Sequence, residues 1–428
     1  MNDLLFRALL FRYGNVCVAD GKTFCFRQAQ DSVFLPVNTI FFLLYVFQIN
    51  TLIPKALGKK VIVSVINDLV TDQRVKKVCD TLQQMGFDLF LAGRRKKESP
   101  AMDHRSYPVH RMKLLFEKGP AFYFCFQLRL FVLLMTRKPD LLVANDLDTL
   151  LPNYLVSRIK NIPLVYDSHE YFTGVPELQR HPLKQKMWKF VEKIIFPRLT
   201  DVFTVNDSIA ALYEKEYGLR PVVVRNVPYL QKKRRSTGRK ALQLPEDKRI
   251  LILQGAGINM HRGAEEITEA MQFIENALLL MVGSGDVLDV LKEKVRRLHL
   301  EQKVRFVPRQ PYEKLMEYTA VADLGLSLDK DTNLNYRYSL PNKIFDYLHA
   351  GIPVLASPLP EIKKVIETYE VGDFIPDHLP LHMAQKVNEI FSHPEKLLRW
   401  KQNTQRAAQE LHWGKESEKL KEVYAKYV

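Results

Sequence analysis

From Lys59 onward, the sequence alternates short apolar runs with amphipathic helical segments, and the alternation occurs twice. The first series of apolar runs lies at 59–68, 87–93, 140–146, 163–170 and 201–207. The second lies at 249–257, 277–286, 303–310, 322–328 and 352–358. Strands that alternate with helices form parallel sheets, which bind ligands at the carboxyl ends of their strands. The sequence therefore predicts an α/β protein with two successive doubly wound parallel-sheet domains.

Shifts in composition divide the chain into five segments. An apolar N-terminal extension over 1–58 precedes the first α/β domain over 59–228. Residues 229–248 are basic and poor in large apolar side chains, which is typical of a linker. The second α/β domain covers 249–395. The charged amphipathic helices of 396–428 are expected to cross back to the first domain.

The extension holds an apolar stretch over 33–57. Pro36, Asn38 and Gln48 interrupt it, so it falls short of the run of about 20 apolar residues that a membrane span needs. We expect an interfacial or core-packed helical segment, with a transmembrane or re-entrant helix as the alternative. The first residues lack the basic region of a signal peptide.

The net charge and the cysteine pattern limit the kinds of ligand and the cellular compartment that we expect. A net charge of +15 fits phosphate-bearing ligands, nucleic acid or an anionic membrane face. None of the four cysteines stands in a C-x-x-C pair, so neither a disulfide framework nor a zinc site is expected. We expect reduced thiols in a cytoplasmic compartment.

A glycine-rich loop, Gly255-Ala-Gly257-Ile-Asn-Met-His-Arg262-Gly263, joins a predicted strand to a predicted helix. Backbone N–H groups at such a place bind anions. Met260 stands where the dinucleotide fingerprint needs its third glycine, and no Gly-Lys-Ser/Thr follows as in a P-loop. Arg262 could donate hydrogen bonds to a phosphate; a tight turn with a solvated arginine is the alternative.

A second glycine pair, Gly283 and Gly285, also joins a strand to a helix. Alone it is a weak signal, and an ordinary turn is the alternative.

The stretch 335–361 (NYRYSLPNKIFDYLHAGIPVLASPLPE) predicts a helix whose N-terminus Ser339 or Asn342 could cap. Lys343 lies near that N-terminus, where the helix dipole disfavours a cation unless an anion is bound beside it. Asp346 could pair with Lys343 one turn away. Alternatively, its carboxylate could accept hydrogen bonds from two sugar hydroxyls.

Polar residues also follow the strands of the first domain. His169, next to Glu170 at a strand end, could act as an acid or base or donate to a sugar; a structural histidine is the alternative. Asp146 belongs to a D-x-D sequence, but Asp148 is expected to start a helix and no third metal ligand is evident.

Asp72 and Arg74 follow the first strand of the regular region and are expected on the crevice side. For Asp72, a helix cap is the alternative.

Taken together, these residues resemble glycosyltransferase family 4, a retaining family with the GT-B fold, over about 59–427. The resemblance rests on the order of several motifs: NDLVTDQRVKKVCDTLQQMG at 67–86, VYDSHEYF at 165–172, VVRNVP at 223–228, QGAGINMHRG at 254–263, VGSGDV at 282–287 and SLPNKIFDYLHAGIPVLASPLPE at 339–361. The last is the most specific, and it is similar to bacterial enzymes that build surface polysaccharides.

The resemblance implies two Rossmann-like domains that face a central cleft. A UDP- or GDP-sugar would bind in the C-terminal domain, and a membrane-linked or glycan acceptor in the N-terminal one. The enzyme would be a hexosyltransferase that retains the anomeric configuration, needs no metal or other cofactor, and acts in surface polysaccharide biosynthesis.

The resemblance also assigns roles on the donor side. Asp346 matches the acid that binds the ribose, and Tyr338 stands where the family usually has a glutamate that contacts the sugar. Arg262 matches one of two basic residues on the diphosphate, and Lys343 stands in for the other. The remaining donor-side residues are Gly255, Gly257, Gly283, Gly285, Ser339, Asn342 and Asn226, the last at the interdomain cleft.

On the acceptor side, His169 matches the family's histidine that touches the transferred sugar. We place it with Arg262 and Lys343 as catalytic. Asp72, Arg74, Asp146 and Glu170 are the remaining acceptor-side candidates.

The basic, aromatic region at 111–138, together with the extension, suggests peripheral docking on an anionic membrane, at the cytoplasmic inner face of the plasma membrane. A core helix pair is the alternative.

Two other functions remain possible for the whole protein: a GT-B UDP-sugar 2-epimerase, and a non-enzymatic nucleic-acid binder. We expect no nucleic-acid partner, because the positive residues are scattered and no nucleic-acid-binding motif is present.

Overall fold

The computed structural model divides the chain into two compact units, Met1–Gly58 and Lys59–Val428. It describes residues 16–19, 23–28, 31–36, 58–70, 72–97, 99, 101–179, 181–230 and 237–428. In the first unit, β1 (Val16–Ala19), β2 (Thr23–Gln28) and β3 (Asp31–Pro36) pair as antiparallel neighbours. The predicted helical segment is therefore wrong over 33–36, and its remainder lies outside the described residues.

The N-terminal lobe contains a seven-stranded sheet with the order β10-β9-β8-β7-β4-β5-β6, and every neighbouring pair is parallel. Its strands are β4 (Lys60–Asp68), β5 (Asp88–Arg95), β6 (Val109–Lys113), β7 (Leu141–Asn145), β8 (Leu164–Ser168), β9 (Asp201–Thr204) and β10 (Val222–Val223). Its main helices are α3 (Gln73–Gln84), α4 (Gly119–Thr136), α5 (Leu147–Lys160), α6 (Pro176–Gln179), α7 (Pro182–Ile195) and α8 (Asp207–Tyr217). β6 lies at the edge of this sheet, and its last three residues, 111–113, begin the basic, aromatic region at 111–138.

The C-terminal lobe contains a six-stranded parallel sheet with the order β13-β12-β11-β14-β15-β16. Its strands are β11 (Arg249–Gly255), β12 (Ala277–Gly283), β13 (Val304–Pro308), β14 (Leu324–Ser327), β15 (Val354–Ala356) and β16 (Gly372–Phe374). Its helices are α9 (Ala264–Ala270), α10 (Leu288–Arg297), α11 (Tyr312–Ala320), α12 (Leu334–Arg337), α13 (Asn342–Ala350), α14 (Pro360–Tyr369), α15 (Pro380–Phe391) and α16 (Pro394–Glu410). Apolar cores on both faces of the sheet explain its near-continuous apolar strands.

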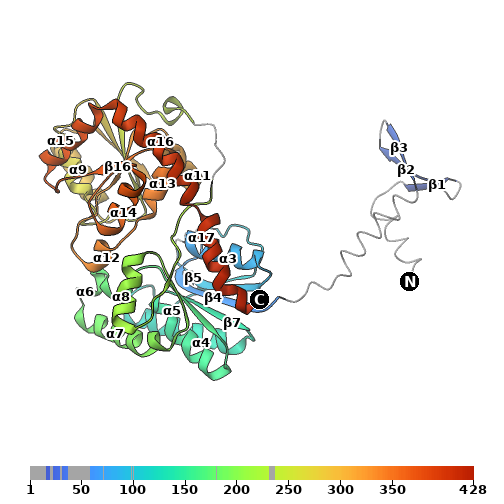
Figure 1. The fold of residues 1–428 in the computed structure, drawn as a ribbon. Helices are drawn as coiled ribbons and strands as arrows, with labels where there is room; N and C mark the ends of the chain where they lie inside the picture. Colours follow the sequence, from blue (N-terminus) through green and yellow to red (C-terminus); the bar gives the residue numbers. More distant parts are fainter. Residues whose placement is uncertain are drawn as a thin grey trace. The chain divides into compact units, whose positions relative to one another are not determined.

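The last helix, α17 (Trp413–Tyr424), lies on the N-terminal lobe beside α3 (Figure 1). Trp413 Nε1 donates to Thr81 Oγ1 at 3.0 Å, and the ring of Tyr424 stacks on Phe203 with centroids 5.8 Å apart. The C-terminus therefore fastens one lobe to the other.

Three further contacts join the lobes around the carboxyl ends of the strands. Ser208 donates to Glu361 Oε1 through both its N–H, at 3.0 Å, and its hydroxyl, at 2.6 Å. Asn206 Nδ2 donates to the carbonyl of Tyr338 at 2.7 Å. Asn335 Nδ2 donates to Glu170 Oε2 at 2.9 Å. These contacts hold the ligand-binding edges of the two sheets facing each other.

Candidate functional site

A cavity of about 570 Å³, here called the interlobe cavity, lies between the carboxyl ends of the two sheets. This volume is typical of sites that bind small molecules. Eleven of the residues predicted from sequence line it: Asp72, Arg74, His169, Glu170, Asn226, Gly255, Gly257, Arg262, Ser339, Asn342 and Lys343. Four others do not: Asp146, Gly283, Gly285 and Asp346.

The glycines form one wall in two layers. Gly255 and Gly257 face the cavity, and Gly283 and Gly285 pack behind them. A Cβ on Gly283 would lie 1.8 Å from the carbonyl oxygen of Gly255, and one on Gly285 would lie 1.9 Å from that of Ile258. Gly283 and Gly285 therefore allow their loop to pack closely against the Gly255 loop. They do not line the interlobe cavity themselves.

Two cations, Arg262 and Lys343, line the cavity on the C-terminal lobe. Arg262 Nη1 lies 3.4 Å from Asp329 Oδ1, and its guanidinium lies 4.8 Å from the ring centroid of Tyr336. Burial opposes the charged guanidinium, but Asp329 and Tyr336 outweigh that effect and raise the pKa of Arg262. Burial lowers the pKa of Lys343, and the charge of Asp329 opposes this.

Asp329 was not predicted, although it lies only two residues after the end of strand β14. Its side chain is fully buried and neither carboxylate oxygen accepts a hydrogen bond within the described part of the chain. A buried carboxylate is stable only beside positive charge. Asp329 thus holds Arg262 at the cavity wall, and its negative charge also favours the charged form of Lys343.

Helix α13 begins at Asn342, after Pro341, and no side chain caps it. Ser339 Oγ instead donates to the carbonyl of Tyr336 at 2.9 Å, so the cap predicted for Ser339 or Asn342 is wrong. The uncapped N–H groups and Lys343 leave this helix end positive, as an anion site requires.

Asp346 lies behind the cavity wall. Its carboxylate accepts from Tyr312 Oη at 2.9 Å and from Gln254 Nε2 at 3.3 Å, and burial raises the pKa of Asp346 to about 6. It does not form the ion pair with Lys343 that its spacing allowed. Gln254 lines the cavity, so Asp346 reaches the cavity through that amide. Direct binding of a ribose by Asp346 stays a prediction.

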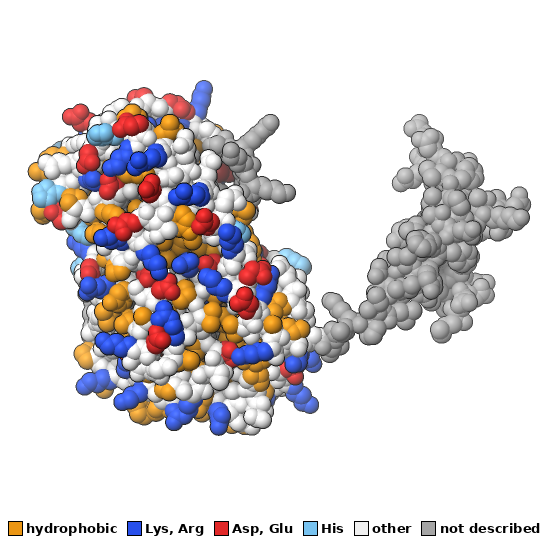
Figure 2. Space-filling view, in the orientation of Figure 1, with side chains coloured by type: hydrophobic (Ala, Val, Ile, Leu, Met, Phe, Trp, Pro, Cys, Tyr) orange, Lys and Arg blue, Asp and Glu red, His pale blue; other side chains and the backbone are white. Residues whose placement is uncertain are grey.

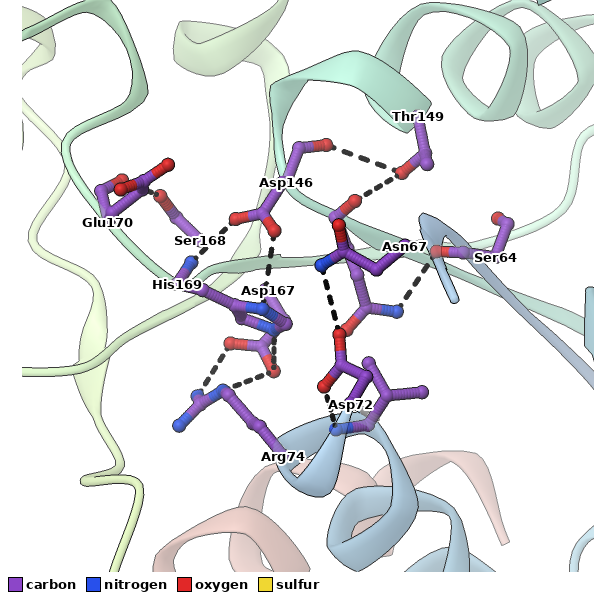
Figure 3. Close-up of polar contacts among 12 residues, drawn as sticks. Ser64, Asn67, Asp72, Arg74, Asp146, Thr149, Asp167, Ser168, His169 and Glu170 are labelled. Carbon is purple, nitrogen blue, oxygen red and sulfur yellow. Dashed lines mark hydrogen bonds and ion pairs between the residues drawn. The ribbon is translucent and has the colours of Figure 1, made fainter. Parts of the chain in front are cut away.

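His169 lies across the cavity between two carboxylates (Figure 3). Its Nδ1 is 3.2 Å from Asp146 Oδ2, and its Nε2 is 3.4 Å from Asp167 Oδ2. Burial favours the neutral imidazole, but the two carboxylates outweigh it and raise the pKa of His169 well above its usual range. The two carboxylates therefore favour the charged imidazole, and each ring nitrogen faces one of them.

Arg74 supports this arrangement from behind. Its guanidinium donates to Asp167 through Nε at 3.0 Å and Nη2 at 2.6 Å, and to the carbonyl of Val224 at 2.7 Å. Because Arg74 is 2% exposed and bound on three sides, it positions Asp167 and, through it, His169. Arg74, predicted on the acceptor side, is thus chiefly a positioning residue.

Asp146 adopts φ 60° and ψ 164°, a conformation that only glycine adopts readily. Its N–H donates to the carbonyl of Asp167 at 2.9 Å, and its Oδ1 accepts from the N–H of His169 at 2.8 Å. Strain of this kind is maintained by its surroundings and clusters at functional sites. Asp146 therefore belongs to the site through His169, although it does not line the cavity.

Two further acids, Asp72 and Asp148, lie near the site. Asp72 caps α3, because its Oδ1 accepts from the N–H of Val75 at 3.0 Å, as the alternative above allowed. Asp148 lies in α5, and burial followed by the charge of Asp146 raises the pKa of its carboxyl well above the usual range. Within the described ranges, no group of three or more His, Cys, Asp or Glu side chains could hold a metal ion.

Comparisons with known proteins cover both lobes. Residues 72–228 match the family described as Glycosyltransferase Family 4, and residues 235–407 match Glycosyl transferases group 1. A chitobiosyldiphosphodolichol beta-mannosyltransferase of Candida glabrata is 21% identical over 444 residues, covering 88% of this chain and 95% of that protein. The protein of the same description from Candida albicans is 26% identical over 255 residues, 54% of each chain.

Solved structures share the architecture. Sucrose-phosphate synthase from Thermosynechococcus elongatus superposes with a TM-score of 0.70 at 16% identity, covering 86% of this chain and 99% of that one. Alr3699/HepE from Anabaena, solved with UDP-glucose, gives a TM-score of 0.68 at 14% identity, covering 86% and 100%. The two-sheet arrangement predicted from sequence is the one these structures have.

Proposed function

The protein is a glycosyltransferase of the GT-B fold, and from that premise we propose that it transfers a hexose from a nucleotide sugar to a lipid-linked acceptor. The observation that carries the proposal is the interlobe cavity, where Arg262 and Lys343 lie on one wall and the charged His169 on the other. One wall suits a diphosphate and the other suits sugar hydroxyls.

The donor's diphosphate would lie against the Gly255 loop and the N-terminus of α13. Negative charge grows on the departing phosphate as the glycosidic bond breaks. Arg262, which Asp329 holds in place, and Lys343 both line the cavity and would stabilise that charge. Closure of the two lobes over the donor would exclude water and so limit hydrolysis of the donor.

The acceptor and the sugar are suggested by the relatives. Both fungal proteins are described as mannosyltransferases acting on chitobiosyldiphosphodolichol, a sugar carried on a lipid diphosphate. This favours mannose as the transferred sugar and a lipid-linked acceptor over a free glycan. UDP and GDP both remain candidates for the donor nucleotide, and a role in surface polysaccharide biosynthesis stays a prediction.

Retention of the anomeric configuration also stays a prediction. The two carboxylates favour a protonated His169, which is no base, and this fits an attack in which the departing phosphate oxygen takes the proton of the acceptor. The relatives' description specifies a β-mannoside, which an α-linked nucleotide sugar yields only by inversion. The anomeric configuration of the product, measured by NMR from the coupling of its anomeric proton, distinguishes retention from inversion. A β product from an α donor would overturn retention. Glu170, which lines the cavity, would then be the candidate base.

We propose that transfer needs no metal ion, because two protein cations already face the diphosphate position. Dialysis against EDTA followed by assay in chelator tests this. Activity within about twofold of the untreated enzyme supports it, and restoration of a lost activity by Mg²⁺ or Mn²⁺ overturns it.

We further propose that the N-terminal lobe contacts the cytoplasmic face of a membrane. Among the described residues, α4 is long and apolar enough to cross one by length and composition. However, Phe122, Phe126 and Leu130 of α4 are buried in the lobe, whereas Phe124 and Leu128 on its other face are 68% and 52% exposed. A helix with one packed face suits an interfacial position. Flotation of the protein with anionic but not neutral vesicles is the test.

The function itself is tested by incubating the protein with a panel of nucleotide sugars, with and without a lipid-diphosphate-linked disaccharide. Transfer predicts release of the nucleotide and an acceptor heavier by one hexose. If an epimerised sugar is released without any acceptor, the 2-epimerase alternative is correct. If neither UDP nor GDP at millimolar concentration raises the melting temperature, the donor site is wrongly assigned.

A further inference from the structure

A second cavity, of about 880 Å³ and here called the lateral cavity, lies beside the interlobe cavity. Helices α4 and α7 line it on the N-terminal lobe, and the loop with Met260 and His261 lines it on the C-terminal lobe. Tyr336 lines both cavities, and its ring contacts the guanidinium of Arg262. The lateral cavity therefore reaches the donor site at Tyr336.

The wall of the lateral cavity is mainly apolar and aromatic. Tyr123 and Phe124 come from α4, Leu151 from α5, and Trp188 and Val191 from α7. The rings of Tyr123 and Trp188 meet edge to face with centroids 5.6 Å apart. Burial of an apolar ligand surface is favourable by about 25 cal/mol per Å². This wall thus suits a hydrocarbon chain better than a sugar or a peptide backbone.

Two cations, Lys118 and Lys184, line the same cavity together with the imidazole of His181. Both lysines are exposed, and neither pairs with another side chain in the part of the chain that the structure describes. Asp286, the acid among the lining residues, already accepts from the N–H of Met260 at 3.1 Å. The uncapped first turns of α4 and α7 add further positive potential at this place.

The lateral cavity continues into an exposed apolar surface. Phe124 and Met187 line it and are also 68% and 55% exposed, and Leu183 and Phe190 extend the same surface along α7. Half of the exposed large apolar side chains among the described residues, 11 of 22, lie between Leu115 and Ile194. In Figure 2, Lys and Arg side chains stand along the lower rim of the N-terminal lobe with apolar side chains between them. Exposed apolar side chains of α4 and α7 thus continue into the lateral cavity, which reaches the donor site at Tyr336.

We propose that the lateral cavity binds the phosphate-bearing polyisoprenoid chain of the acceptor. The hydrocarbon lies against Tyr123, Leu151 and Trp188, and Lys118, His181 and Lys184 hold the phosphates. The glycosyl end is directed to Tyr336. The occupant is one molecule with an apolar chain and an anionic group, because the wall and the cations together fit neither a free sugar nor an uncharged lipid. This inference rests on the proposed function, which it deepens by assigning the acceptor a site.

Trp188 offers a measurement that does not depend on catalysis. The chain has three tryptophans, and Trp400 and Trp413 belong to other apolar cores. The full chain is titrated with geranylgeranyl diphosphate, geranylgeraniol and inorganic diphosphate while tryptophan fluorescence is followed. Geranylgeranyl diphosphate is expected to change the emission with the highest affinity, and Trp188→Phe is expected to remove the change.

Charge variants test the assigned phosphate contacts. The double variant Lys118→Glu, Lys184→Glu is expected to raise the Kd of geranylgeranyl diphosphate at least ~10-fold, the loss expected for one charge-assisted hydrogen bond. Lys186→Glu is the matched control, because Lys186 is exposed on the same helix and does not line the cavity. It is expected to change the Kd less than ~2-fold, as a surface charge does.

Three results overturn the inference: no response of Trp188, equal binding of geranylgeraniol and its diphosphate, or an equal loss in the control. Protection by UDP and GDP is measured on the same samples. Nucleotide protection without binding of geranylgeranyl diphosphate would overturn this inference and leave the proposed function standing. Binding of geranylgeranyl diphosphate without nucleotide protection would overturn the proposed function and leave a lipid-diphosphate site.

Discussion

Asp146 holds His169 at two atoms: its Oδ1 accepts from the backbone N–H of His169 at 2.8 Å, and its Oδ2 lies 3.2 Å from Nδ1. The contact joins the N-terminus of α5 to the residue that follows β8. Because Asp167 lies on the other side of the ring, the imidazole is held in one orientation and its charged form is favoured before a substrate binds. A preorganised donor of this kind needs no rearrangement during the reaction.

Asp146→Asn is expected to lower the transfer rate about 100-fold, because His169 loses a partner that keeps it charged. The raised pKa of His169 adds stability that is complete below its ordinary pKa of 6.5 and is lost as pH rises through the higher folded value. The variant should therefore lose this stability at a lower pH than the wild type does. Rates and melting temperatures across pH measure both effects. Asp88→Asn, at an exposed position, is the control; equal pH profiles would contradict the assignment.

Arg262→Ala and Lys343→Ala are each expected to reduce kcat/KM at least ~100-fold, since each removes a cation facing the leaving diphosphate. Steady-state kinetics with saturating acceptor measure the loss. Arg337→Ala removes an exposed arginine from α12 and should leave the rate unchanged. Near-normal turnover in either variant would show that the substituted residue does not stabilise the leaving diphosphate.

Lys77 should make stability rise with pH. Burial, followed by the nearby Arg74, lowers its pKa from 10.5 to about 7, and its Nζ donates to the carbonyl of Val227 at 2.5 Å. Between these two values the unfolded chain binds a proton that the folded chain does not, so the free energy of unfolding increases with pH. Denaturant titrations across that window should show the increase in the wild type and a flatter profile in Lys77→Met. Parallel profiles would show that Lys77 is charged in the folded protein.

Gly283→Ala is expected to destabilise the fold by about 1–3 kcal/mol, because its Cβ would overlap the carbonyl of Gly255. Gly283 also has φ 151°, which side chains disfavour. Nucleotide protection should weaken as the Gly255 loop shifts. Gly238→Ala is the matched control: Gly238 has φ −63° and open space around its Cα, so a change within about 0.5 kcal/mol is expected. Equal melting temperatures for the two variants would contradict the two-layer packing of the glycine loops.

The apolar runs predicted most of both sheets, because strands buried on two faces are apolar throughout. β7 and β8, for example, are buried along their whole lengths. The strand β6 escaped prediction because it lies at the sheet edge, where His110, Arg111 and Lys113 mask any apolar pattern. β10 and β16 were also missed, since two or three residues are too few to show a period.

The sequence by itself determined the order of strands and helices, the glycine loops, and the types of residue at the ends of the strands. These follow from local backbone preference and from periodic burial, which act over a few neighbouring residues. Only the tertiary structure decided which of those residues act together. Arg74 braces Asp167 from 93 positions away, Asp346 turns inward to Tyr312, and the unpredicted Asp329 supports Arg262. The lateral cavity likewise depends on α4, α7 and a loop of the other lobe, because only chain packing brings such distant segments into contact.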